Sequence, residues 1–234
     1  MALRKVDERV PARVEPTNEG AVGRLVQVLL DAGIDGLGPL KSAQELAHSI
    51  RLQSRSTEAA VAKVARSHVA KGGVGGFVTG VGGFVTMPLA LPANVVEFYV
   101  GATRMVAAIA TLRGYDVDDP QVRTAVLLTL VGSEADEVLS KAGLTGGTGG
   151  KVLGMAAGQL PPAGLLMLNK AIGFRILRGV GEKAFSRLGR AVPLAGGVLG
   201  GAIDMWMMKR IADHAMHEFP PLGPAPGVVR PSRH

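Results

Sequence analysis

The sequence predicts an all-α protein, a helical bundle with glycine-rich apolar hairpins that are buried or inserted into a membrane. No segment shows the alternation of apolar and polar residues that is typical of a half-buried strand. Apolar residues make up 47% of the 234 residues, aromatic residues only 4%, and there are 33 glycines. Small residues therefore carry most of the hydrophobicity, which favours helices whose backbones approach closely.

Start and stop signals divide the bundle into elements. Ser42 and Glu45 match a capping box, Asp119 followed by Pro120 is a strong helix start, and Gly114 is a natural stop. The residues expected to end the first helix are Gly33, Gly36, Gly38 and Pro39. The expected helices cover 20–34, 41–71 with a restart at Ser56 or Thr57, 92–113, 120–131, 133–141, 170–190 and 191–219.

The ends of the chain differ from its middle. Residues 1–19 mix charges with two prolines, so we expect a flexible N-terminal arm. They contain no apolar run behind a basic region, so we expect no secretory signal there. Residues 220–234 are rich in proline and glycine, and we expect a disordered tail. The helical domain between them covers 20–219.

The segment 72–96 has no charged side chain and carries seven glycines. Glycine in a water-exposed helix costs about 1 kcal/mol relative to alanine, but small residues four apart allow close helix contacts, above all in lipid. The close-packing glycines expected from this spacing are Gly72, Gly76, Gly80, Gly196 and Gly200. A straight span needs about 20 apolar residues, and prolines interrupt both 72–96 and 152–169. Hairpins or buried helix pairs are therefore favoured over full spans.

Three polar residues, Asn94, Glu97 and Arg104, fall on one side of the otherwise apolar helix 92–113. A carboxylate and a guanidinium on such a helix must be paired or face water. One interpretation is a polar pocket for a lipid head group or a substrate. The other is a structural pair that fixes the register of the helix.

The segment from Lys170 to Arg190 predicts a basic amphipathic helix. One broad side carries Arg175, Arg178, Lys183, Arg187 and Arg190. The other carries Phe174, Leu177, Ala184, Phe185 and Leu188, while Ile172 and Ile176 break the pattern. Such a helix can lie in the interface of an anionic membrane. The alternative is the solvated face of an ordinary bundle helix.

Several function classes are excluded or disfavoured. The chain has no cysteine, so disulfides, thiolate metal sites and cysteine nucleophiles are excluded. The glycine loop at 145–152 lacks the first glycine and the Ser or Thr of a phosphate-binding loop. His214 and His217 match no zinc signature, and no Gly-x-Ser-x-Gly elbow occurs. We expect no metal, no cofactor and no catalytic residue.

Four blocks of residues follow one another along the chain. The first is the glycine-rich run into Pro88, Leu91-Pro92-Ala93-Asn94 and Glu97. The second is Arg104, Ile109-Ala110 and Gly114-Tyr115-Asp116, and the third is the Pro161 segment with Lys170 and the basic helix. The fourth is Pro193, Gly196, Gly200-Gly201, Asp204, Ala212, Ala215 and Phe219. In this order the four blocks resemble the EcsC family, bacterial proteins named after a gene beside an ABC-transporter pair. Asn94 stands where that family often has an acidic residue. The resemblance implies a bacterial, mostly helical protein near the inner membrane.

The net charge of +7 and the apolar runs together favour a membrane-associated accessory or scaffold protein. It would bind anionic lipid or a membrane-protein partner on the cytoplasmic side of the inner membrane, peripherally or partly inserted. This interpretation requires an apolar patch beside the basic face. The alternatives are an enzyme acting on a lipid or amphiphile at Glu97 and Arg104, and a soluble homo-oligomer joined through glycine faces. Nucleic acid is not expected as a partner, because no recognition motif is present.

Overall fold

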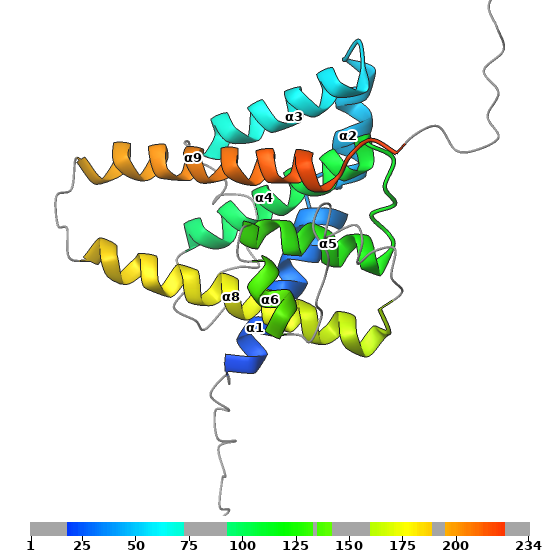
Figure 1. Cartoon of the computed structure of the whole chain (residues 1–234). Helices are drawn as coiled ribbons and strands as arrows, with labels where there is room; N and C mark the ends of the chain where they lie inside the picture. Colours follow the sequence, from blue (N-terminus) through cyan, green and yellow to red (C-terminus); the bar gives the residue numbers. More distant parts are fainter. Residues whose placement is uncertain (1–17, 73–92, 133–134, 142–159, 189–194, 223–234) are drawn as a thin grey trace, which may run out of the picture.

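The computed structural model describes residues 18–72, 93–132, 135–141, 160–188 and 195–222, and every regular element in those ranges is a helix (Figure 1). The all-α class is therefore confirmed. The helices are α1 (Asn18–Val28), the π-helical η1 (Leu29–Asp35), α2 (Ala43–Leu52), α3 (Thr57–Gly72), α4 (Ala93–Leu112), α5 (Pro120–Val131), α6 (Ala135–Lys141), α8 (Pro162–Leu188) and α9 (Ala195–Glu218). The glycine-rich stretch 73–92, with Gly76 and Gly80, and the stretch 142–159 lie outside the described residues.

The capping signals of the sequence are confirmed. Ser42 Oγ accepts from the backbone N–H of Glu45, and the Glu45 carboxylate accepts from the N–H of Ser42, which closes the capping box of α2. Asp119 accepts from the N–H of Gln121 at 2.8 Å and caps α5. Gly114 has a φ of 96°, a left-handed conformation that glycine adopts without strain after a helix.

Two central helices, α4 and α5, form the core. Every residue from Met105 to Ala110 and from Thr124 to Leu130 is buried. A helix that is buried all round must have neighbours on every side, and α4 packs against α2, α3, η1, α5 and α9. In the described part of the chain, only α4 is long and apolar enough to cross a membrane, over Val95–Leu112. Of that window 61% is buried in the bundle, and a core helix meets the same criterion.

Two long helices cover opposite sides of this core. In Figure 1, α9 lies above α4 and α5 together with α3, whereas α8 lies below them and runs in the opposite direction. The packing agrees with this view, since α9 contacts α3, α4 and α5, and α8 contacts α5, α1 and α6. Each of the two helices therefore turns one side to the core and leaves the other to solvent.

Close backbone packing occurs at two glycines that the sequence analysis did not select for it. A Cβ at Gly33 of η1 would lie 2.7 Å from Cβ and Cγ2 of Thr103 in α4. A Cβ at Gly173 of α8 would lie 2.8 Å from side-chain carbons of Val22 and Val26 in α1. The sequence predicted that Gly33 ends the first helix, and this prediction is wrong. The helix η1 continues to Asp35, and Gly33 lies at its contact with α4. Gly36, with a φ of 83°, follows the true end.

Candidate functional site

One surface of α8 carries apolar side chains that the bundle does not cover. Leu166 and Met167 are each 73% exposed, and Phe174 is 46% exposed. Lys170 and Arg178 are also exposed and continue the same row at helical spacing. We call these five residues the α8 outer face. It combines three large apolar side chains with two bases.

The opposite side of α8 explains why this face is left open. Leu168, Ile172 and Ile176 are almost completely buried, where α8 packs on α1 and α5. The described part of α8 is divided into a packing side and an open side differently from the basic and apolar sides expected from the sequence. The two isoleucines that break the pattern in the sequence form the packing side, and Phe174, assigned to the apolar side, is exposed. Pure periodicity failed because both sides of the helix are rich in apolar residues.

The predicted lipid-facing bases are distributed unevenly around α8. Arg178 is exposed, Arg175 is half-buried, and both take part in interactions within the protein. Lys183 and Arg187 belong to α8, but their side chains lie outside the described part, as does Arg190. From Pro162 to Arg178 the helix contains Lys170, Arg175 and Arg178 and no acidic residue. The charge of this stretch is thus uniformly positive.

A second exposed apolar surface lies on α9 and was missed by the sequence analysis. Trp206 is 58% exposed, and the guanidinium carbon of Arg210 lies 4.9 Å from the centroid of its ring. Ile203, one turn earlier, is 45% exposed. A tryptophan with an aliphatic residue three positions before it and an arginine four after it is a detectable signal, since these positions share one helix face.

Arg104, on the polar side of α4, interacts electrostatically with Glu45 of α2 and His68 of α3. Arg104 is half-buried, and among the described residues no group accepts a hydrogen bond from its Nη1, which is shielded from solvent. Burial lowers the pKa of Arg104, and the carboxylate of Glu45 on α2 opposes that effect. Glu97, two turns earlier on α4, is half-buried and takes part in an interaction within the protein. The side chain of Asn94 lies outside the described part.

His68 of α3 is the second buried polar group in this region. Its side chain is buried, and its Nδ1 lies 3.0 Å from the carbonyl oxygen of Val64. Burial lowers the pKa of His68 to about 4, and the charges of Lys71 and Arg104 act in the same direction. The imidazole is therefore neutral at pH 7, and the positive charge of Arg104 contributes to the lowering of its pKa.

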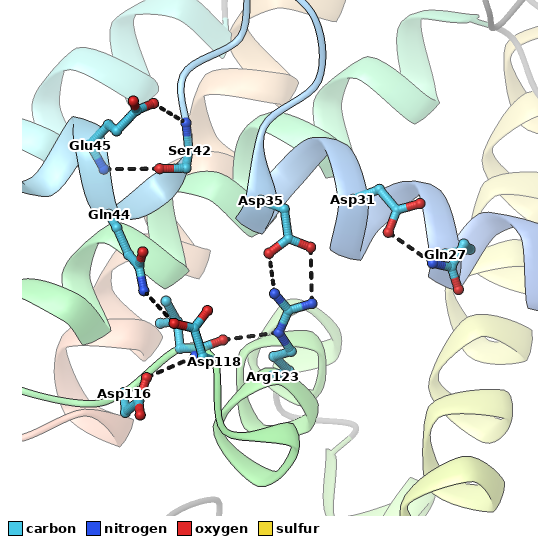
Figure 2. Close-up of polar contacts among 10 residues, drawn as sticks. Gln27, Asp31, Asp35, Ser42, Gln44, Glu45, Asp116, Asp118 and Arg123 are labelled. Atoms are coloured by element: carbon cyan, nitrogen blue, oxygen red, sulfur yellow. Dashed lines mark hydrogen bonds and ion pairs between the residues drawn. The ribbon is translucent and has the colours of Figure 1, made fainter.

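A third polar group, drawn in Figure 2, is structural. Arg123 of α5 donates to both carboxylate oxygens of Asp35 at the end of η1 and, through Nε, to the carbonyl of Val117 at 3.0 Å. Gln44 of α2 donates to Asp118 at 3.1 Å. These bonds join η1, α2 and the start of α5, and each carboxylate already has its donor. This network therefore holds η1, α2 and the start of α5 together.

No protein-family model matches the chain, and no curated protein or solved structure does. Within the described residues, no group of three or more histidine, aspartate and glutamate side chains could hold a metal ion. Three features of the molecule bear on its function, namely the α8 outer face, the Trp206 surface and the polar side of α4.

Proposed function

We propose that this protein binds anionic membrane lipid through the α8 outer face and serves as an accessory or scaffold protein at that membrane. The observation that carries the proposal is the row of exposed Leu166, Met167 and Phe174 with exposed Lys170 and Arg178 in the same row. Burial of apolar surface gains about 25 cal/mol per Å². Each base near an anionic bilayer adds about 1 kcal/mol.

The chemistry of this face favours a lipid surface over a protein groove. Interfacial helices bury an apolar side in the region between head groups and acyl chains while bases contact the lipid phosphates. The stretch from Pro162 to Arg178 has no acidic residue that would repel those phosphates. The packing side of α8 stays on α1 and α5, so binding requires no unfolding of the bundle.

The resemblance to the EcsC family supports the same placement, because it implies a bacterial protein near the inner membrane. We accordingly propose a peripheral position on the cytoplasmic side. A membrane-protein partner would be an addition to this contact, since a lipid surface offers contacts to both the apolar and the charged residues of the face.

Co-sedimentation of the full chain with vesicles tests the proposal. Vesicles of phosphatidylcholine with phosphatidylglycerol should bind the protein, and pure phosphatidylcholine vesicles should bind it much more weakly. Replacing Lys170 and Arg178 together by glutamate removes about 2 kcal/mol of attraction, so we expect at least about thirtyfold weaker binding. Replacing Met167 and Phe174 together by serine should weaken binding by removal of the apolar contact.

Two control variants have the same chemistry elsewhere on the surface. Leu52 at the end of α2 is 74% exposed, so Leu52→Ser removes an apolar side chain outside the face. Lys63→Glu reverses an exposed base on α3. Both controls should bind vesicles like the original protein. Equal binding by the α8 variants and the controls would refute the proposal.

A further inference from the structure

The outer side of α9 carries a continuous row of exposed side chains. Its members follow one another at alternating intervals of three and four residues, and they are Ile203, Trp206, Arg210, Asp213 and His217. This spacing places them on one side of the helix, in the arrangement by which two helices face each other in a coiled coil. We call these residues the α9 row. It extends for about 20 Å along the helix.

The bundle is built on the other side of α9. Met208, Ile211, Ala212 and Ala215 are buried, where α9 packs on α3, α4 and α5. The helix α8 lies across the core from α9 (Figure 1). A partner can therefore cover the α9 row without unfolding the bundle and without covering the α8 outer face.

The composition of the α9 row favours a protein partner over a lipid surface. Tryptophan and arginine are the residues that most often dominate the binding energy of protein interfaces. Trp206 is 58% exposed, and the guanidinium carbon of Arg210 lies 4.9 Å from the centroid of its ring, so the two side chains hold each other in place. Such preorganisation lowers the entropic cost of binding. The carboxylate of Asp213 in the same row would be repelled by the phosphates of an anionic bilayer.

The charges of the α9 row are complementary to those of a second copy of the same row. In an antiparallel pair of α9 helices, a twofold axis between Arg210 and Asp213 places Arg210 of each copy opposite the partner's Asp213. The Asp213 carboxylate, which accepts from Lys209 at 2.6 Å, can accept from this guanidinium as well. In the same register, Trp206 of each copy lies opposite the partner's His217. One contact thus gives two ion pairs and covers both indole rings.

We propose that this protein forms a twofold dimer in which the α9 rows of two copies pack antiparallel. A standard protein interface buries about 800 Å² on each partner, and smaller ones are typical of transient contacts. Because the row is one side of a single helix, we expect a dimer that forms and dissociates with concentration. This inference goes beyond lipid binding and does not depend on it.

Sedimentation equilibrium of the full chain at rising concentrations tests the dimer. We expect a reversible monomer–dimer equilibrium. Trp206→Ser removes the aromatic anchor and should raise the Kd of the dimer by about tenfold or more. Leu52→Ser is the matched control, since Leu52 is 74% exposed at the end of α2 and lies outside the α9 row. The control should associate like the original protein.

A charge exchange tests the antiparallel register. Arg210→Glu alone places two acids opposite each other at both ends of the contact, and Asp213→Arg alone places two bases there. Each variant by itself should therefore remain monomeric, because like charges that meet at an interface repel. An equal mixture of the two variants regains opposite charges at both positions and should form a heterodimer. Rescue in the mixture also shows that both variants are folded.

The proposal is overturned if the unmodified protein stays monomeric at every concentration, or if it dimerises and the α9 variants associate as it does. It is also overturned if the mixture associates no better than either variant alone. The α8 variants separate this contact from the proposed membrane contact. Lys170→Glu with Arg178→Glu should keep the dimer, because both residues belong to the α8 outer face. Loss of vesicle binding with a retained dimer therefore tells the two surfaces apart.

Discussion

Arg113 and Glu58 form an ion pair at 3.0 Å that joins the end of α4 to the first turn of α3. The same guanidinium donates to the carbonyl oxygens of Met216 and Phe219. Helices leave their last carbonyls without intrahelical partners, and Arg113 supplies partners at the end of α9. One side chain thus fastens three helices at one end of the bundle.

Replacing Arg113 by methionine should lower the free energy of unfolding by about 3 kcal/mol. The change removes charge-assisted bonds and leaves two carbonyls without this donor. Glu58→Gln should cost less than about 1 kcal/mol, since the Glu58 side chain is 59% exposed and water can replace the pair. Urea unfolding followed by circular dichroism measures both. Similar losses of unfolding free energy in the two variants would show that the ion pair, rather than the carbonyl contacts, provides most of the stabilisation.

Gly33 and Gly23 should respond in opposite ways to the same substitution. Gly33→Ala forces a Cβ to 2.7 Å from two carbons of Thr103, so the helices must separate, at about 1–3 kcal/mol. Gly23→Ala meets open space on α1 and should stabilise the helix by up to about 1 kcal/mol. Thermal unfolding of the two variants gives the comparison. A stabilising Gly33→Ala would mean that η1 and α4 are farther apart in solution.

The sequence was informative about the capped starts of α2 and α5, but it expected the basic helix to begin at Lys170, whereas α8 begins at Pro162. It was uninformative about which side of a helix packs. Capping is local, so Ser42 with Glu45 and Asp119 with Pro120 could be recognised without tertiary information. Packing depends on residues distant in the chain. Nothing near Gly33 shows that Thr103 will lie against it, and nothing in α8 alone shows that Ile172 is buried while Phe174 is exposed.

The candidate site was predictable to a similar degree. Glu97 and Arg104 could be placed on one side of α4 from spacing alone. His68 joins Arg104 only because α3 and α4 pack together over a long separation in sequence. An isolated histidine in the sequence gave no sign of this, and its burial is a property of the fold.

His68 should make the protein less stable as the pH falls from about 7 toward 4. Its pKa is about 4 in the folded protein and 6.5 as the ordinary value. Between these values the unfolded chain binds a proton that the folded one does not, so the contribution to stability is complete above 6.5 and is lost on the way to 4. The full difference corresponds to about 3 kcal/mol.

Comparison with a His68→Gln variant isolates this group from the carboxylates that titrate below about pH 5. Urea unfolding in phosphate-free buffer at several pH values gives the difference in unfolding free energy between the two proteins. That difference should fall steadily as the pH is lowered. A difference that is independent of pH would mean that His68 is not buried in solution.

Trp206 gives a direct probe of whether α9 also contacts lipid, since it is the only tryptophan of the chain. Exposed tryptophan beside a base suits the region between head groups and acyl chains, and Trp206 is 58% exposed against Arg210. Because α8 and α9 cover opposite sides of the core, a vesicle bound through α8 should leave this emission unchanged, and a shift to shorter wavelength on addition of phosphatidylglycerol vesicles would reveal a second contact through α9. Reversing the charge of Arg210 with Arg210→Glu should reduce that shift, whereas Lys63→Glu should not. If the vesicles bind the protein without any shift, the membrane contact is confined to α8 and the Trp206 surface serves another purpose.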